Sequence, residues 1–525
     1  CHFLQAAGLN ILVDCGMEQG NDVYENQELP IAASDVDCIL LTHAHIDHSG
    51  LIPLMYVNGF RGQVYSTSAT AQLCEIMLRD SAHIQMFEAE WRNRKAARSG
   101  GKLKEFVPLY DMDAAVNVCK QFVGCEYDRV YDIAEGIKIR FTDVGHLLGS
   151  ASIEVWATEN TENGDVTEKI VFSGDIGNIN KPIIKDPKHV RDADYVVMES
   201  TYGNRSHGGT PNYVEDLTDI FKRTFERGGN VVIPSFAVGR TQELLYIIRK
   251  IKEDNLVGRD FDVYMDSPLA IEATNIFIKN VESCFDDEAV ELVRKGINPL
   301  TFPGLKYATT GDESKQINFD PNPKVIISSS GMCEAGRIRH HLKHNLWRPE
   351  CTIVFVGYQA VGTTGRIIVD GAEEIKLFGE PIQIKAEIVQ LQGSSGHADK
   401  DGLLCWINAF DTKPKKVFVV HGEDSVCDEF TECLKEEYGY DAMAPYTGGS
   451  YDLIADRVIS EGVKERKTRR TTSTQRGKTV FDRLVAAGKR LMTVITHNEG
   501  GTNKDLAKFT DQINALCDKW DRPDM

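Results

Sequence analysis

Three histidines and an aspartate follow one apolar stretch of this sequence within six positions. The run Val36–Leu41 predicts a buried strand, and the segment HAHIDHSG begins just after it, at His43. Side chains alternate along an extended chain, so His43 and His45 point the same way. Asp47 and His48 follow at the turn and reach a second point nearby. Such a loop could simply be solvated, but two pairs of ligands after a strand favour a site for two metal ions, roughly 3.5–4 Å apart.

Further candidate ligands stand at the ends of later predicted strands. His146, Asp175 and His421 each lie in a turn that follows an apolar, strand-like run. A lone residue of this kind is more often a hydrogen-bonded turn residue, but the repeated placement favours ligands. An aspartate can donate one oxygen to each of two ions, which makes Asp175 the natural bridging ligand. Imidazole with carboxylate favours zinc, while manganese and iron stay open from ligand type alone. We expect two zinc ions, one held by His43, His45, His146 and Asp175 and the other by Asp47, His48, Asp175 and His421.

At these positions the sequence resembles a known family. The segments HAHIDHSG, VGHLLGS and FSGDIG resemble the second, third and fourth motifs of the metallo-β-lactamase fold, and LVDCG resembles the first. The resemblance implies that Asp14 in LVDCG orients the metal loop without binding metal, since ligating histidines need their other ring nitrogen held. Three later segments resemble motifs A, B and C of the β-CASP subgroup of RNA-processing nucleases: Met198–Gly203, Gly393–Asp399 and Val420–Glu423. The match spans roughly residues 1 to 455.

The resemblance implies a fold class and a division of the chain. The expected architecture is α/β: a metallo-β-lactamase αββα sandwich, an inserted parallel α/β β-CASP domain and a helical C-terminal extension. Strands that alternate with helices after Tyr213 agree with a parallel sheet. The first strand of the lactamase domain is expected to be missing, because in the family an earlier strand comes first. The expected domains are the first part of the lactamase domain at 1–203, the β-CASP domain at 204–379, the second part of the lactamase domain at 380–456 and the extension at 457–525.

The formal net charge of −19 bears on the substrate. It limits non-specific binding to nucleic acid, but two divalent ions carry about +4 locally, so an RNA substrate is compatible with it. We therefore expect a shaped channel and not an open basic face. No run approaches the length of a membrane span, no secretory leader precedes the first strand, and the 13 cysteines lack framework spacing. These features favour a cytoplasmic protein with free thiols.

The resemblance also implies catalytic roles. A water molecule that bridges two zinc ions has its pKa brought near neutrality and becomes the hydroxide nucleophile. His397 of motif B is expected to protonate the leaving ribose oxygen, and Glu199 of motif A to hold its imidazole protonated and correctly turned. Asp47 is expected to be a catalytic residue as well as a metal ligand. The simpler interpretation is that Glu199 caps a helix and that His397 is a loop residue.

Substrate contacts are predicted from weaker patterns. Ser329 and Gly331 lie in a small-residue segment after one predicted strand, and Gly362–Arg366 follows another. Backbone amides there could cradle a phosphate, although such strand exits are common in α/β proteins. Arg240 and Arg366 are candidate phosphate clamps, because the guanidinium fork matches phosphate oxygens.

The expected function is a zinc-dependent ribonuclease that cuts single-stranded RNA, mainly as an endonuclease. The sequence resembles that of the pre-mRNA 3′-end cleavage endonuclease subunit and of its bacterial and archaeal homologues. The alternatives are a 5′–3′ exoribonuclease and a DNA nuclease of the cross-link-repair branch, which typically has valine where this chain has His421. A small-molecule hydrolase such as a glyoxalase would lack the inserted domain, and an inactive paralogue would have lost ligands. Apolar positions at helical spacing in the extension predict a homo-oligomer.

Overall fold

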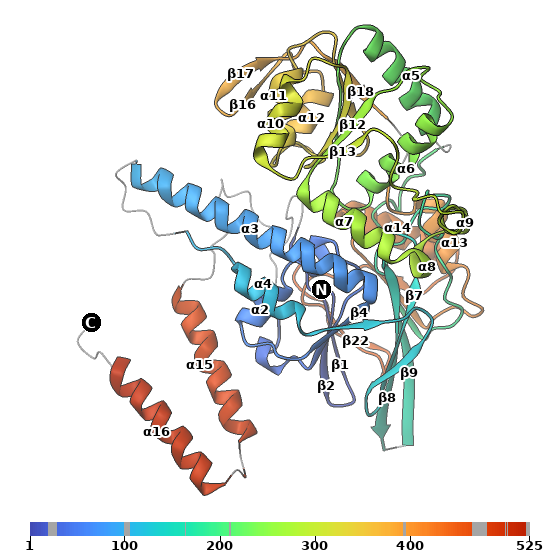
Figure 1. The fold of residues 1–525 in the computed structure, drawn as a ribbon. Coiled ribbons are helices and arrows are strands. Elements are labelled where there is room, and N and C mark those ends of the chain that lie inside the picture. Colours follow the sequence, from blue (N-terminus) through green and yellow to red (C-terminus); the bar gives the residue numbers. More distant parts are fainter. Residues whose placement is uncertain are drawn as a thin grey trace.

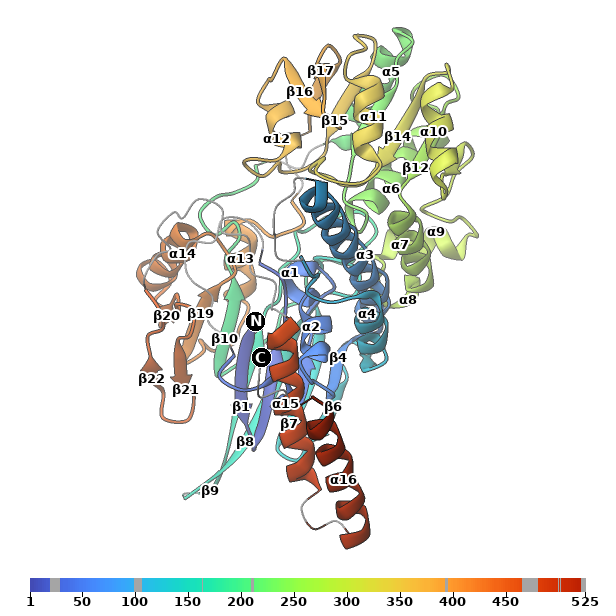
Figure 2. The ribbon, with the colours of Figure 1, turned by 90° about the vertical axis from the view of Figure 1, so that its left-hand side faces the viewer.

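The chain forms two folded parts and a C-terminal pair of helices (Figure 1; Figure 2). The computed structural model describes residues 1–18, 29–98, 106–162, 164–208, 212–391, 395–464, 480–498, 500 and 502–520. Gly393 and Ser394 of the predicted motif B lie outside the described residues. We call the part with two facing sheets the sandwich domain and the part with a parallel sheet the inserted domain. Figure 2 shows the inserted domain at the top of the view and the sandwich domain below it.

Two sheets pack face to face in the sandwich domain. The first has the order β1-β2-β3-β4-β5, with strands at His2–Ala6, Leu9–Val13, Cys38–Leu40, Gln63–Thr67 and Phe122–Cys125. The second has the order β20-β19-β10-β9-β8-β7-β6; from β6 to β10 its strands lie at Val130–Ala134, Ile137–Asp143, Ala151–Thr161, Gly164–Phe172 and Tyr195–Glu199, and β19 and β20 lie at Lys416–Val420 and Ala442–Met443. Ile11 and Val13 face the second sheet, whereas Leu12 between them points outward, as alternation requires.

Helices cover both outer faces of this sandwich. The first sheet carries α1 (Ile46–Ser49), α2 (Ile52–Val57), α3 (Ser68–Arg98) and α4 (Met112–Cys119), and the second carries α13 (Lys400–Ile407) and α14 (Asp424–Glu436). Leu73 of α3 packs in the same core as Val64 of β4. Trp406 of α13 and Phe430 of α14 pack with Val196 of β10. The predicted αββα sandwich is thereby confirmed.

The inserted domain is built on a six-stranded parallel sheet of order β13-β12-β14-β11-β15-β18. Its strands β11 to β15 lie at Val231–Pro234, Asp262–Asp266, Leu305–Tyr307, Lys324–Ser328 and Thr352–Phe355, and β18 at Glu387–Gln390. The helices α5 to α12 lie at Tyr213–Glu226, Arg240–Glu253, Pro268–Lys279, Val281–Cys284, Asp287–Arg294, Gly311–Phe319, Ile338–Asn345 and Thr364–Val369. Every residue of β11, β14 and β15 is buried, as expected for a parallel sheet covered on both faces. The predicted parallel insert is confirmed.

The end of the inserted domain departs from the expected division at residue 380. A small hairpin, β16 (Glu374–Leu377) with β17 (Glu380–Gln383), spans that position. After it, β18 still pairs in parallel with β15, from Thr352 opposite Glu387 onward. The last strand of the six-stranded sheet therefore comes from the segment assigned to the second part of the lactamase domain. A four-residue edge strand gives little signal in the sequence. The other domain limits stay predictions.

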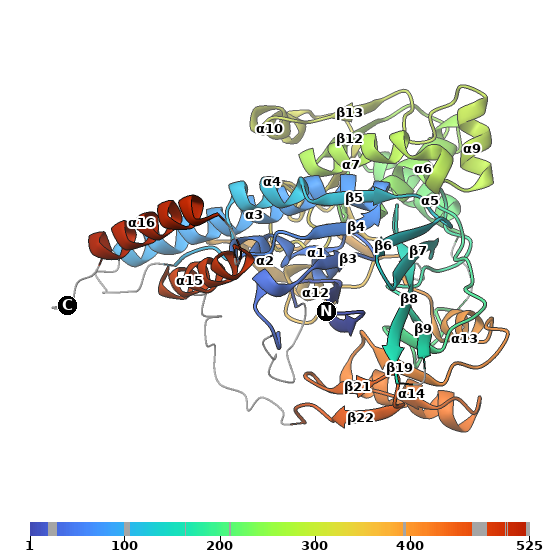
Figure 3. The ribbon, with the colours of Figure 1, turned by 90° about the horizontal axis from the view of Figure 1, so that it is seen from below.

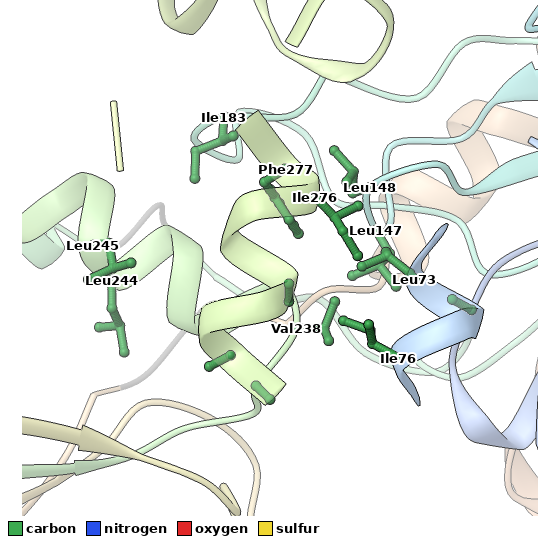
Figure 4. Close-up of a cluster of buried hydrophobic side chains, with 14 of the residues drawn as sticks. Leu73, Ile76, Leu147, Leu148, Ile183, Val238, Leu244, Leu245, Ile276 and Phe277 are labelled. Carbon is green, nitrogen blue, oxygen red and sulfur yellow. The ribbon is translucent and has the colours of Figure 1, made fainter. Parts of the chain in front are cut away.

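One apolar cluster joins the two domains (Figure 4). Leu147 and Leu148 come from the loop after β7 in the sandwich domain, and Leu73 comes from α3. Val238 and Phe277 of the inserted domain belong to the same buried cluster. Because this loop also carries His146, both domains fix its position.

The C-terminal part is helical, as predicted. A hairpin of β21 (Ser450–Asp452) and β22 (Arg457–Ser460) comes first, and α15 (Val480–His497) and α16 (Asn503–Trp520) follow. Figure 3 shows these two helices projecting at one end of the molecule. The Thr493 hydroxyl of α15 lies 3.4 Å from the Ser34 hydroxyl, beside η1 (Ala33–Asp35). No helix among the described residues is long and apolar enough to cross a membrane.

Candidate metal centre

The loop between β3 and α2 presents two pairs of candidate ligands. His43 follows β3 and is fully buried, and His45 is the N-cap residue of α1. Asp47 and His48 lie within α1 and not in an open turn. The one-turn helix displaces the second pair from the first, so one loop can serve two neighbouring points.

Four donor groups converge on the first point. His43 Nε2 lies 3.1 Å from His45 Nδ1 and 3.4 Å from Asp175 Oδ2. His146 Nε2 lies 3.2 Å from His45 Nδ1 and 3.6 Å from Asp175 Oδ2. With metal–ligand bonds of about 2.1 Å, a tetrahedral zinc ion holds its ligand atoms about 3.4 Å apart. The spacing of these four groups therefore fits one zinc ion.

A second group of donors lies on the other side of Asp175. Asp47, His48 and His421 bring their ligand atoms within 4.8 Å of one another. Asp175 Oδ1 lies 3.2 Å from His48 Nε2 and 3.3 Å from His421 Nε2. One carboxylate thus turns Oδ2 toward the first group and Oδ1 toward the second. The structure brings together all seven of the ligands predicted from the sequence.

Asp14 holds the metal loop from behind, where the first motif was expected to place it. Its Oδ2 lies 2.7 Å from His48 Nδ1, and its carboxylate accepts hydrogen bonds from the backbone and hydroxyl of Thr42. With Nδ1 engaged in this way, His48 turns Nε2 toward Asp175. Gly16 makes the close approach of this segment to the loop feasible, since a Cβ there would lie 1.5 Å from the carbonyl oxygen of Asp47.

Two buried atoms of the centre test whether a cation fits there. His48 Nε2 and Asp175 Oδ1 lie 3.2 Å apart, but they form a hydrogen bond neither with each other nor with another atom in the described part of the chain. A buried polar atom left without a partner costs about 1–3 kcal/mol. A cation between these two atoms would satisfy both, so the donor set fits a metal ion at the second point as well.

The protonation states of His45, His146 and Asp175 agree with metal binding, whereas His48 has to lose a proton to become a ligand. Burial lowers the pKa of His48, but the carboxylates of Asp175 and Asp14 outweigh burial and hold it well above its usual range. Burial, with His43 close by, lowers the pKa of His45 to about 3. Burial also holds the pKa of His146 well below its usual range. Burial disfavours ionisation of Asp175, but the imidazoles around it, His421 first, outweigh burial and hold the pKa of the carboxyl well below its usual range. Neutral imidazoles and an ionised carboxylate are the forms that ligate zinc.

His397 and Glu199 form a pair beside the two donor groups. His397 Nδ1 lies 3.1 Å from Glu199 Oε2, and His397 Nε2 lies 3.9 Å from Asp175 Oδ2. Glu199 is buried at the end of β10 and also accepts a hydrogen bond from the backbone of Ile176. Burial opposes protonation of His397, but the carboxylates of Glu199 and Asp175 raise its pKa to about 9. The imidazole is therefore held as a cation that presents Nε2–H to the centre.

The predicted substrate contacts lie at the carboxyl edge of the inserted sheet and in α6. Ser329 and Gly331 follow β14, and the backbone amide of Gly365 donates to the carbonyl oxygen of Met332, which brings the segment of Arg366 beside them. Arg366 pairs with Asp370, the C-cap residue of α12. Arg240 pairs with Glu243 at 2.7 Å. Both guanidinium groups are thus engaged within the protein, and their role as phosphate clamps stays a prediction.

The sequence analysis missed an ion pair behind the first donor group. The buried ammonium of Lys181 donates to the backbone carbonyl oxygen of His146 at 2.9 Å. It also lies 3.3 Å from Glu243 of α6. Lys181 therefore connects a candidate metal ligand to the inserted domain. The only signal in the sequence was a lysine six residues after Asp175, which carries no pairing information by itself.

Three family models match the chain in order. They are a metallo-beta-lactamase superfamily domain at residues 3–176, a Beta-Casp domain at 241–368 and a Zn-dependent metallo-hydrolase RNA specificity domain at 381–445. Ribonuclease TTHA0252 of Thermus thermophilus is 34% identical over 424 residues, which cover 81% of this chain and 90% of that protein. The chain belongs to the metallo-β-lactamase superfamily, β-CASP subgroup. As a β-CASP member with these His and Asp clusters, it is a zinc-dependent hydrolase.

Transcription termination factors of archaea are also similar. Transcription termination factor FttA of Methanosarcina mazei is 32% identical over 460 residues, which cover 85% of this chain and 68% of that protein. Its namesake in Thermococcus kodakarensis is 29% identical over 419 residues, covering 78% of this chain and 61% of that protein. The β-CASP domain removes the alternative of a small-molecule hydrolase without an insert.

Proposed function

We propose that this protein is a ribonuclease with two zinc ions that cuts single-stranded RNA, mainly endonucleolytically. The observation that carries the proposal is the placement of Asp175. Its two carboxylate oxygens face two separate donor groups, and Nε2 of His397, whose Nδ1 pairs with Glu199, lies 3.9 Å from Oδ2. A site of this kind can act on a phosphodiester from both the attacking and the leaving side.

The roles of the chain's own residues follow from their positions. Two zinc ions bound at these groups would supply an activated water molecule and offset the charge of the phosphate. Asp175 would bridge them, with Asp14 holding His48 in its ligating orientation. His397 would donate the proton on Nε2 to the leaving ribose oxygen, and Glu199 would keep the imidazole charged and turned toward the centre. Asp47 would be a further ligand of the second ion, beside His48 and His421.

RNA as the substrate is supported by two findings. The segment 381–445 matches a domain described as conferring RNA specificity, and the ribonuclease of Thermus thermophilus is similar over most of both chains. His421 is present where the DNA branch would be expected to have valine. With a net charge of −19, recognition would depend on a shaped cleft near the centre and not on general basicity.

A circular single-stranded RNA distinguishes endonuclease from exonuclease action, because it offers no end. We expect the zinc-loaded protein to cut the circle, and the first product to be a linear RNA of full length. The measurement is the time course of circle loss on a denaturing gel, with the Asp175→Ala protein as the inactive control. A resistant circle beside rapid loss of a 5′-phosphorylated linear RNA would instead establish the 5′–3′ exoribonuclease.

The C-terminal helices are proposed to serve assembly as a homo-oligomer. Leu484 and Met492 of α15 and Leu516 and Trp520 of α16 are all more than half exposed. Apolar side chains exposed on consecutive helices indicate a surface that another chain covers. No candidate metal ligand group among the described residues includes a residue of this segment.

Truncation after Lys464 tests the assembly role and leaves the β21–β22 hairpin whole. We expect the truncated protein to contain fewer chains per particle, as measured by light scattering, and to retain its turnover on a short RNA. Leu516→Asp and Trp520→Asp in the full chain should lower the number of chains per particle in the same way. Loss of turnover on truncation with unchanged zinc content would show that the helices take part in substrate binding instead.

A further inference from the structure

We propose that Phe236 and Tyr358 form a stacking platform for RNA bases at the carboxyl edge of the inserted sheet. This proposal rests on the proposed ribonuclease function and deepens it, since it names the part of the substrate that these residues recognise. The platform would hold bases of single-stranded RNA, whereas the centre in the sandwich domain acts on the backbone.

The exposure pattern of the β11–α6 loop is the first observation. Ser235, Ala237 and Val238 are 9% exposed or less, whereas Phe236 between them is 49% exposed. The largest apolar side chain of the loop is thus the one that faces water. The small residues on both sides of the ring are buried instead. An exposed phenyl ring on a fixed loop is suited to contact a partner.

Neighbouring strand exits repeat this arrangement. β14, β11 and β15 are adjacent in the sheet and parallel, so their carboxyl ends lie at the same edge. The exit of β14 carries Ser329 and Gly331, the exit of β11 carries Phe236, and the exit of β15 carries Tyr358, which is 53% exposed. Ligands of open α/β sheets bind at this edge. Two exposed aromatic rings therefore follow one after the other beside the segment in which phosphate contacts were predicted.

Direct contacts lock these three exits together. A Cβ at Gly331 would lie 3.1 Å from Cδ2 and 3.2 Å from Cε2 of Phe236, so the ring rests against the backbone of that glycine. Gln359, which follows Tyr358 and is buried, donates from its side-chain amide to the carbonyl oxygen of Gly331 at 3.1 Å. The rings are consequently presented by a rigid support. Fixed aromatic rings stack bases at a low cost in conformational entropy.

The same loop connects the platform to the metal centre. Gly239, three residues after Phe236, packs against the side chain of Leu147, which follows His146. Glu243 in the helix that begins after this loop pairs with Lys181, which holds the carbonyl oxygen of His146. The loop that carries Phe236 thus contacts, at Gly239, the loop that carries His146 across the boundary between the domains. We expect RNA bound at the centre to extend from there to the platform.

The substrate for the test is a pair of end-labelled RNAs of one length and sequence. In the second RNA, three residues on each side of the cleavage site lack the base but keep the ribose and the phosphate. Stacking contributes about 1–3 kcal/mol per base, or roughly a 5- to 150-fold change in affinity. We expect Phe236→Ala and Tyr358→Ala each to raise KM for the complete RNA by a factor in this range. KM for the abasic RNA, kcat at saturation and zinc content should stay unchanged.

Three further variants make the result specific to stacking. Phe236→Trp should restore the low KM, while Phe236→Leu, which keeps apolar bulk without an aromatic face, should behave like Phe236→Ala. Phe319→Ala is the matched control: this ring is 77% exposed, and it ends α10 shortly before β14 begins, at the amino edge of the same sheet. Phe319→Ala should leave KM unchanged for both RNAs.

Two outcomes would overturn the platform. One is an unchanged KM for the complete RNA in Phe236→Ala and Tyr358→Ala, which would leave the rings to a protein partner. The other is an equal rise in KM for both RNAs, which would show that the rings only shape the cleft. Failure of the ribonuclease function itself is distinct, because the unmodified zinc-loaded protein would then cut neither RNA.

Discussion

Asp175→Ala protein is expected to purify without its metal ions and to have no measurable nuclease activity. Asp175 is the only residue shared by the two proposed ligand sets, with one carboxylate oxygen 3.4 Å from His43 and the other 3.3 Å from His421. Its removal takes one ligand from each set and leaves the first set without a carboxylate to balance the charge of an ion. Elemental analysis after gentle purification should find two zinc ions per chain in the parent protein and close to none in the variant.

The control for this experiment is another buried aspartate. Asp266 of the inserted domain is fully buried and lies 2.6 Å from His341, so its environment is chemically similar. Asp266→Asn is expected to lower stability but to leave zinc content unchanged. Retention of both ions by Asp175→Ala would contradict the bridging role.

His397→Ala should slow RNA cleavage by roughly 10²–10⁴-fold without loss of zinc, the usual contribution of a positioned acid or base. The imidazole is held as a cation by Glu199 and presents Nε2 to the centre. The measurement is the single-turnover rate at saturating RNA, with zinc content determined on the same sample. Loss of zinc from this variant would identify His397 as a ligand.

Glu199→Gln should act on the same step, because Glu199 contributes only through His397. The double variant should then be little slower than either single variant, since residues that act as a unit are not additive. Multiplicative losses would instead mean that Glu199 has a separate task, such as holding the backbone of Ile176.

The strands and the ligand set could be predicted because each depends on a short, continuous pattern of residues in the sequence. β14 and β19 lie where continuous apolar runs placed them, at Lys324–Ser328 and Lys416–Val420. Each candidate ligand follows such a run. The strands before these ligands, β3 in the first sheet and β7, β9 and β19 in the second, end at the same edge of the sandwich, which brings His43 and His421 to the one carboxylate of Asp175. Seven motifs in the expected order then fixed the family.

What could not be predicted depends on short elements and on distant pairs. The helix at Ile46–Ser49 is too short to show helical periodicity, so a turn was predicted at these residues. The contact between Lys181 and Glu243 joins side chains from different domains, and no local pattern in the sequence predicts it. Arg240 shows that residue type alone can suggest a contact that the fold does not leave open. Its guanidinium suits a phosphate, but it is already paired with Glu243.

The apolar cluster that includes Leu147, Val238 and Phe277 has a consequence for engineering. The inserted domain cannot be exchanged as a cassette between relatives, because its removal would bare apolar side chains on both halves and release the loop that carries His146. A chimera would need the matching residues of α3 and of this loop to be transplanted together with the insert. A substitution in the insert that disturbs this packing is therefore expected to alter metal affinity through the loop of His146.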